Sequence, residues 1–242
     1  MSAEDPLERR SLVDLVTAKL RDEILSGRYD KGATLPAERA LAEKLRVNRT
    51  SLKHALMRLE QLGFISTRHG IGSVVLDPLE SAGAQLLSHW VFRSAGIDRA
   101  ALSDVIEART LMGGFLARLA AERRTKDDLK RMRHALAKLE SAEADPERIQ
   151  ELELGFFRSM LQATNNRIFV LVANSMFAIY GSRAHVFREA FADGEHTRTR
   201  LEKIAQAIEE KNGETAEKVA VEYLRANGRA LVDAAVRAES LE

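Results

Sequence analysis

Basic and hydroxyl side chains follow Asn48 directly, at the start of a predicted helix: Arg49, Thr50, Ser51 and Lys53. Arginine can donate two hydrogen bonds to one guanine, and hydroxyl and ammonium groups can bind phosphates or base edges. A helix that enters a major groove contacts the bases with its N-terminal turn. These residue types at this position therefore predict a helix that reads double-stranded DNA.

The charge of the chain is distributed unevenly. Between Lys31 and His69 there are eight Lys or Arg and three acidic residues, a local net charge of +5, whereas the whole chain carries +1. A basic segment on a nearly neutral chain suggests a polyanionic partner for that segment alone. A small helical domain whose polar face binds another protein is the alternative that the pattern leaves open.

Other kinds of chemistry find little support. The chain has no cysteine, which excludes disulfides, thiolate metal sites and cysteine nucleophiles and fits a reducing cytoplasm. It lacks a G-x-S-x-G elbow, a phosphate-binding loop and a dinucleotide fingerprint. Glu151 and Glu153 would point apart on a helix. We therefore expect a protein that is not an enzyme. The absence of a long apolar run or a signal peptide predicts a cytoplasmic location without membrane contact.

The elements that position the basic residues follow from local patterns. Three helices with apolar stripes are predicted, one from Ser11 to Gly27, one starting near Pro36, and one from Asn48 to Gly63. Strands are predicted at 64–67 and 73–75, where glycines permit the tight turn between them. Three helices followed by a hairpin are typical of a winged helix-turn-helix.

Leu76-Asp77-Pro78 is the predicted domain boundary, which divides the chain into 1–77 and 78–242. Strand signals are absent beyond it. Helical periodicity predicts seven helices, at roughly 80–95, 98–123, 126–143, 147–163, 166–191, 196–211 and 214–239. The expected fold is mainly α: an N-terminal winged helix-turn-helix joined to a C-terminal all-α antiparallel bundle that can bury a core or a ligand cavity.

The N-terminal motifs resemble those of the GntR superfamily of bacterial transcription regulators. The resemblance rests on the LPAER box, the VNRTSL start of the third helix, the A-L-x-R-L-x-x-x-G exit and the H-G-x-G wing. It implies operator contacts by Arg39, Arg49, Lys53 and His69, in addition to Thr50 and Ser51. Lys53 replaces the commoner arginine, which favours a phosphate contact. A helix-turn-helix of this kind implies a homodimer on a palindromic operator.

The C-terminal half resembles the FadR subgroup of that superfamily. The resemblance rests on DVIEARTLMGGFLARLAAERRT, ELELGFFRSMLQATNNRIFVLVANSMFAIYGSRAHVF and AEKVAVEYLRANGRAL. Many members bind a divalent metal through one Asp and three His. The matching positions here are Glu153, Phe157, Leu201 and Tyr223, which predict no metal site. Whether His185 and His196 meet in a residual site is left open.

Because it lacks these metal ligands, the sequence resembles the branch of the subgroup that contains the fatty-acid-responsive FadR regulators. That resemblance implies a long-chain fatty acyl-CoA effector that binds in the helical domain and releases the DNA, and thus a role in fatty acid metabolism. A regulator of the same fold that senses a small organic acid or sugar acid is the alternative. No cofactor is expected. The candidate effector contacts are Arg109, Phe157, Tyr180, Arg183, Tyr223 and Asn227.

Arg109 and Arg183 lie in mainly apolar stretches, and an inward arginine requires an anion or a carboxylate partner. Either could clamp a ligand carboxylate or phosphate. The alternatives are an internal pair with Glu107 or Glu153 and a solvent-facing side chain. The pair Gly113-Gly114 in a predicted helix indicates a close helix approach or a kink.

Overall fold

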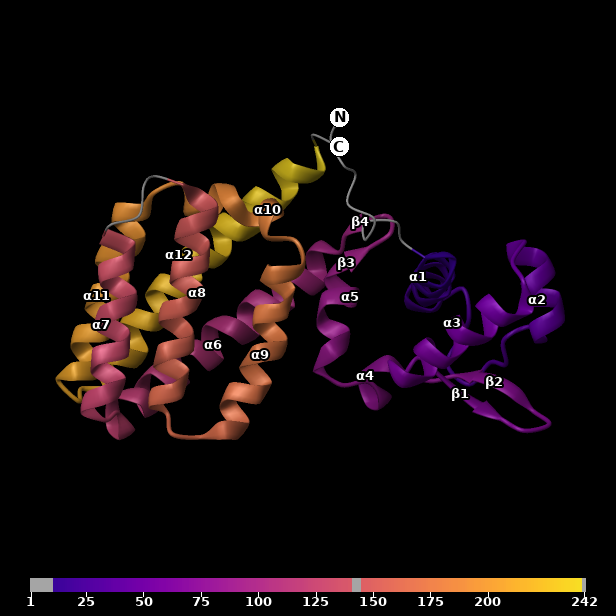
Figure 1. Ribbon diagram of the computed structural model, residues 1–242, viewed down its shortest axis with the longest axis horizontal. Helices are drawn as coiled ribbons and strands as arrows, with labels where there is room; N and C mark the ends of the chain where they lie inside the picture. The colour runs from indigo at the N-terminus through magenta and orange to yellow at the C-terminus, as the bar shows by residue number, and fades with distance from the viewer. Residues whose placement is uncertain (1–10, 141–144, 241–242) are drawn as a thin grey trace, which may run out of the picture. The chain divides into compact units, whose positions relative to one another are not determined.

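The computed structural model describes residues 11–140 and 145–240. The chain divides into two compact units, Met1–Gly96 and Ile97–Glu242, each with its own internal contacts (Figure 1). None of the described helices is long and apolar enough to cross a membrane. The expected combination of a small winged helix unit and a larger all-helical unit is confirmed.

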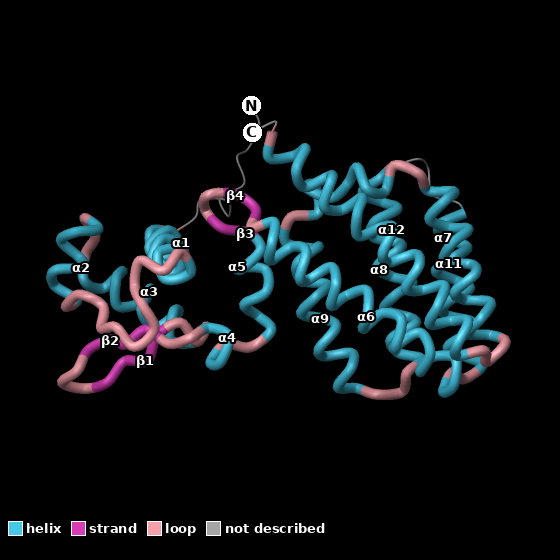
Figure 2. Tube along the Cα trace, turned by 180° about the vertical axis from the view of Figure 1, so that it is seen from behind, coloured by secondary structure: helices cyan, strands magenta, loops and turns pink. Residues whose placement is uncertain are grey.

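The first unit contains short helices and a two-stranded wing, which Figure 2 shows in cyan and magenta. In chain order its elements are α1 (Leu12–Leu25), α2 (Glu38–Leu45), α3 (Arg49–Gln61), β1 (Ile65–Arg68), β2 (Gly72–Val75), α4 (Pro78–Ser81), η1 (Ala84–Leu86), α5 (Leu87–Val91) and β3 (Phe92–Arg93). β3 pairs with β4 (Gly96–Ile97), and the division between the units falls within β4.

Side-chain caps fix where α1 and α3 begin. Ser11 and Asp14 form a reciprocal capping box, in which each side chain accepts a hydrogen bond from the other's backbone N–H. The Asn48 side chain accepts a hydrogen bond of 2.7 Å from the backbone N–H of Ser51. Such caps satisfy donors that have no partner within the helix, so both predicted helix starts are confirmed.

The predicted apolar stripes form the core of this unit. Its buried members come from all three helices, from both strands of the wing, from η1 and from the connecting segments at Leu35 and Phe64: Val16, Leu20, Ile24, Leu35, Leu41, Ala42, Leu52, Ala55, Leu56, Leu59, Phe64, Ile65, Val75 and Leu86. The spacing of the stripes on each helix places one face of each toward this shared core.

The wing pairs antiparallel, with Ile65 opposite Val75 and Arg68 opposite Gly72. Gly70 in its turn and Gly72 at the start of β2 both have positive φ (77° and 100°), a conformation that glycine adopts without steric cost. The strands thus begin and end within one residue of the predicted ranges.

The sequence-based prediction of a helix over 80–95, and of no strands beyond residue 77, is wrong. Helix α4 ends before Ala82 and Gly83, which are not helical. The chain then forms η1, α5 and β3. Leu86 is buried in the winged helix core, and Trp90 packs against the same core. Residues 78–96 therefore belong with the first unit, so the division lies later than the predicted boundary after Asp77.

Polar contacts also tie this segment to α1. The Arg21 guanidinium lies 3.0 Å from Nδ1 of His89. Asp22 accepts a hydrogen bond of 2.8 Å from the backbone N–H of Ser94 and pairs with Arg21 at 2.7 Å. Burial, together with the positive charge of Arg21, lowers the pKa of His89. The neutral imidazole is therefore the form that fits this contact.

We expect the first unit to lose stability as the pH falls below about 6.5, the unperturbed histidine pKa. The unfolded chain then binds a proton at His89 that the folded unit disfavours, so stability is retained above this pH and decreases below it. His89→Gln should flatten this dependence. Denaturation of the wild type and the variant can be followed by the fluorescence of Trp90, the one tryptophan in the sequence. His54→Gln, at an exposed position of α3, is the control, and equal pH profiles for wild type and H89Q would contradict this account.

The second unit is a helical bundle. Its elements are α6 (Arg99–Arg123), α7 (Lys126–Glu140), α8 (Pro146–Ala163), α9 (Arg167–Ser182), α10 (Ala184–Phe187), η2 (Arg188–Phe191), α11 (Gly194–Glu209) and α12 (Gly213–Glu239). The long helix predicted over 166–191 is divided, because the backbone at Arg183 leaves the helical region (φ −146°, ψ 54°). The end of the helix predicted over 126–143 lies partly outside the described residues.

α6 and α12 make the most extensive contact in this unit. A Cβ atom on Gly114 would lie 2.4 Å from Cγ2 of Val221, and one on Gly113 would lie 2.2 Å from Cδ1 of Leu224. α6 continues through both glycines without a break. The glycine pair therefore permits a close helix approach, one of the two expected explanations, and produces no kink.

Two glycine substitutions should have opposite effects on the free energy of unfolding. Gly155→Ala in α8 should raise it by about 0.5–1 kcal/mol, because nothing lies within 4 Å of the added Cβ and alanine favours a helix. Gly114→Ala should lower it by about 1 kcal/mol, because overpacking costs about 1–3 kcal/mol and exceeds the helical gain. Scanning calorimetry can compare both variants with the wild type. A stabilising G114A would show that α6 and α12 can separate freely.

Candidate DNA-binding surface and effector cavity

The N-terminal part of α3 presents polar side chains on the face opposite to the core. Arg49, Thr50 and Lys53 are exposed, whereas Leu52 and Leu56 are buried beneath them. The backbone N–H of Ser51 is already used by the Asn48 cap, so its hydroxyl is the group left for other contacts. An exposed, positively charged first turn has the geometry that major-groove reading requires.

The two other predicted DNA contacts lie elsewhere in the same unit. Arg39, in the first turn of α2, is exposed and forms an ion pair of 3.2 Å with Glu43 one turn later. His69 is exposed in the loop of the wing. An exposed ion pair of this kind contributes little to stability, so Arg39 can exchange Glu43 for a phosphate at small cost.

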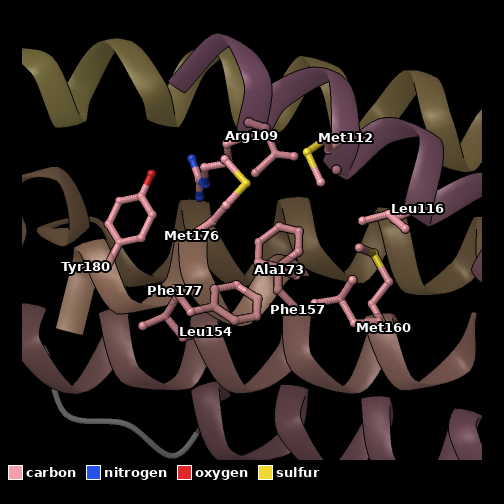
Figure 3. A pocket seen from close by; sticks show the side chains of 13 residues that line it. Arg109, Met112, Leu116, Leu154, Phe157, Met160, Ala173, Met176, Phe177 and Tyr180 are labelled. Atoms are coloured by element: carbon pink, nitrogen blue, oxygen red, sulfur yellow. The ribbon is translucent and has the colours of Figure 1, made fainter. Parts of the chain in front are cut away.

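In the helical unit, residues of α6, α8, α9 and α12 line a partly open cavity of about 50 Å³. Its lining is apolar except for Arg109 and Tyr180: Arg109, Met112, Gly113, Leu116, Leu154, Phe157, Met160, Leu161, Ala173, Met176, Phe177, Tyr180 and Leu224. Figure 3 shows the guanidinium of Arg109 and the hydroxyl of Tyr180 at one end, and Leu116 with Met160 at the other. The cavity therefore has a polar end and an apolar end.

Arg109 is held at the polar end by groups from two other helices. It donates hydrogen bonds to Oδ1 of Asn227 (2.8 Å) and to Oε1 of Glu153 (3.3 Å). The hydroxyl of Tyr223 donates to the same Glu153 oxygen at 2.9 Å. The guanidinium also lies 5.3 Å from the ring of Tyr180, a cation–π distance. These contacts fix the arginine and join α6, α8 and α12.

Burial perturbs the titratable groups of this cluster. It raises the pKa of Glu153, an effect that the charge of Arg109 and the hydrogen bond from Tyr223 oppose. It raises the pKa of Tyr180, and it raises that of Tyr223 well above the usual value, with the carboxylate of Glu153 adding to both. Both phenols are therefore neutral. The hydroxyl of Tyr180 is buried and has no hydrogen-bond partner among the described residues.

The predicted effector residues are brought together in part. Arg109, Phe157 and Tyr180 line the cavity, and Tyr223 and Asn227 hold the polar end from α12. Arg183 is half-buried at the junction of α9 and α10 and is not among the lining residues. Of the alternatives for Arg109, the structure realises the internal pair with Glu153.

Sequence reasoning missed part of the cavity wall. The sequence offers Met112, Met160, Met176 and Phe177 as apolar, adaptable residues for a ligand pocket, but Leu116, Leu154, Leu161, Ala173 and Leu224 line it as well. Of these residues, only Leu154 could have been assigned to the cavity from sequence, because it lies next to Glu153. Leucine and alanine at helical spacing otherwise indicate an ordinary core. The pairing of Glu153 with Arg109 could be listed as one option from sequence, because an inward arginine requires a carboxylate.

Of the four positions that hold the metal in the similar FadR subgroup, Glu153, Phe157 and Tyr223 lie next to one another here. The rings of Phe157 and Tyr223 are stacked, with centroids 6.2 Å apart, and Tyr223 contacts Glu153. Leu201 is fully buried. His185 and His196 are both exposed. Within the described ranges, no three His, Asp or Glu side chains are grouped so that they could hold a metal ion.

Comparison with known proteins gives two domain matches. Residues 12–75 match the gntR family of bacterial regulatory proteins, and residues 104–226 match the FCD domain. An uncharacterized HTH-type transcriptional regulator of Mycobacterium tuberculosis is 34% identical over 96% of this chain and 94% of its own length. The fatty acid metabolism regulator protein of Cronobacter sakazakii is 28% identical over 66% of this chain and 65% of its own length.

A solved structure agrees at the level of the fold. That of Lar, described as controlling the Listeria monocytogenes agr system, covers 95% of this chain and 99% of its own, with a TM-score of 0.56 and 19% identity. Together with the domain matches, the exposed first turn of α3 and the bundle that follows it identify the molecule as a regulator and not an enzyme. The chain belongs to the gntR family of bacterial transcriptional regulators, with an FCD domain as its C-terminal unit.

Proposed function

We propose that this regulator binds a palindromic operator as a homodimer and that a fatty acyl ligand in the helical unit, long-chain acyl-CoA in particular, modulates this binding. The proposed DNA contacts are Arg39, Arg49, Thr50, Ser51, Lys53 and His69. The proposed ligand site is the cavity with Arg109 and Tyr180 at its polar end. The observation that carries the ligand proposal is the apolar lining of this cavity.

The DNA contacts are supported by the exposure of the first turn of α3. Arg49 points its charge away from a core that Leu52 and Leu56 fill. The planar guanidinium can bind guanine bidentately, whereas the ammonium of Lys53 suits a phosphate. Arg49 is therefore expected to contribute to sequence specificity, and Lys53 to salt-dependent affinity.

Arg49→Ala should weaken operator binding strongly. Loss of one bidentate base contact costs about 1–3 kcal/mol per half-site, so a dimer that loses it on both half-sites should bind the operator about 30- to 20,000-fold more weakly. The operator can be obtained by selection from random duplexes with the wild-type protein, and affinity measured by fluorescence anisotropy. Arg28→Ala removes an equal charge from an exposed position paired with Glu23 and is the matched control. Equal affinities for R49A and R28A would rule out base reading by Arg49.

An apolar chain suits the cavity better than a sugar acid does. Apart from Arg109 and Tyr180, every lining side chain is apolar, and a buried hydroxyl without a hydrogen-bond partner is costly. The methionines Met112, Met160 and Met176 are flexible side chains that adapt to ligands of varying shape. The similarity to a protein named for the regulation of fatty acid metabolism is consistent with an acyl ligand.

A long acyl chain requires the cavity to widen. One water needs about 10–15 Å³ of such volume, so about 50 Å³ holds only a few waters. The wall formed by α9 is suited to move, since its outer residues Ile168 and Leu171 are each 63% exposed. An outward shift of α9 breaks few contacts on that side, and the chain of the ligand would cover the inner face that it exposes.

Filling the cavity should abolish the response to ligand. We expect oleoyl-CoA to release the wild-type protein from operator DNA in a gel-shift assay, whereas CoA alone does not. Ala173→Leu places a larger side chain in the cavity and should require at least tenfold more oleoyl-CoA for release. Ala178→Leu, at an exposed position of the same helix, should behave as the wild type.

Two results would oppose the acyl ligand. DNA retention by the wild type at saturating oleoyl-CoA would exclude it as the releasing effector. Release by a sugar acid such as gluconate, abolished in A173L, would favour the alternative of a small organic acid. Native mass spectrometry of the purified protein gives an independent measurement, because a ligand retained through purification shows its mass directly.

A further inference from the structure

At the polar end of the cavity the guanidinium of Arg109 faces the carboxyl group of Glu153, and the charge of Arg109 opposes the rise in the pKa of Glu153 that burial causes. Arg109 and Glu153 pair at 3.3 Å, with exposed side-chain fractions of 12% and 1%. Asn227 and the hydroxyl of Tyr223 complete the hydrogen bonds without adding charge. Arg109 therefore already has an internal carboxylate where a ligand carboxylate would be expected to bind.

No other charged group among the described residues acts on the pair of Arg109 and Glu153. The titratable groups that act on it are Arg109 of α6, Tyr223 of α12 and Tyr180 of α9, and both phenols are neutral. Helices α7, α10, α11 and η2 also pack against α8, and the described titratable groups on them do not contribute to the pKa of Glu153. From α11, the neutral hydroxyl of Thr197 contacts Tyr223.

A second anion in this site is unfavourable. A ligand carboxylate beside Arg109 would lie close to the carboxylate of Glu153, whose side chain is only 1% exposed. Two carboxylates that share one site cannot both remain ionised at little cost, so one of them takes up a proton. An uncharged ester or thioester carbonyl enters the site without this requirement.

The structure also provides a donor for such a carbonyl. The hydroxyl of Tyr180 is buried, belongs to the cavity lining and has no partner among the described residues. Figure 3 shows it at the same end as the guanidinium of Arg109. A buried hydroxyl without a partner is costly, and a carbonyl oxygen that accepts its hydrogen bond removes that cost.

We propose that Glu153 is a specificity-determining residue, which neutralises Arg109 and makes the cavity select uncharged acyl esters over free carboxylic acids, with Tyr180 donating to the ester carbonyl. A free acid binds only together with a proton. This inference rests on the proposed function, since it concerns the head of the acyl ligand, whereas the apolar lining concerns its chain.

Calorimetry with two probes of equal chain length, decanoate and methyl decanoate, tests the proposal on the full-length protein. For methyl decanoate we expect an affinity that does not change between pH 6 and pH 8. For decanoate the dissociation constant should rise about tenfold per pH unit, as coupling to one proton requires. Titrations in buffers with different ionisation enthalpies should show the uptake of about one proton per decanoate.

Variants locate the effect. Glu153→Gln retains the size of the side chain and removes its charge, so decanoate should bind without proton uptake and without pH dependence. Glu151→Gln, at an exposed position of α8 that pairs with Arg148, should match the wild type. Tyr180→Phe keeps all charges, so it should weaken methyl decanoate about tenfold and leave the proton uptake with decanoate unchanged. Tyr180→Phe also provides a test of the proposal if E153Q does not fold.

The outcomes separate the two proposals. Decanoate that binds the wild type as tightly as its ester, with no proton uptake, would overturn the role of Glu153 and leave the acyl ligand in place. Proton uptake that persists in E153Q would overturn it as well. If neither probe binds and oleoyl-CoA does not release DNA, the acyl ligand itself is excluded, and the selectivity fails with it.

Discussion

A guanidinium in the interior of a helical bundle requires a carboxylate beside it, and this requirement organises the second unit. Arg109 of α6 is met by Glu153 of α8 and Asn227 of α12. Removing one member of a buried pair leaves the other charge without compensation, at a cost of about 3–5 kcal/mol. The three helices are therefore held in one arrangement at this point, and the apolar cavity begins where the polar cluster ends.

The part of the first unit up to Asp77 could be predicted almost entirely from sequence, because its signals are local. The caps at Ser11 and Asn48 and the apolar stripes lie within single helices, so no knowledge of the neighbouring elements was needed. The segment after Asp77 could not be predicted in this way. Its apolar residues Leu86 and Trp90 suggest a helix by periodicity, but their burial against the winged helix core is a tertiary contact that determines where the backbone turns.

The candidate ligand site was predicted less completely. The apolar neighbours of Arg109 favour an inward arginine but leave a solvent-facing side chain open, and the choice between Glu107 and Glu153 as its partner depends on which face of α6 packs against α8. The glycines at 113 and 114 allow α12 to approach α6 closely, and Glu107 is exposed. Arg183 resembles Arg109 in its sequence surroundings, but the helix ends there, so it lies outside the cavity lining.

The packing of residues 78–96 on the winged helix also affects how such regulators can be recombined. A chimera joined after Asp77 takes residues 78–96 from the second parent. The counterparts of Leu86 and Trp90 from that parent would then pack against the winged helix core of the first parent, and the counterpart of His89 would face Arg21. A junction at Gly96 keeps both sets of contacts within a single parent. Shuffling of operator specificity between relatives, in the laboratory or in evolution, is therefore expected to tolerate crossovers near Gly96 better than crossovers at the end of the wing.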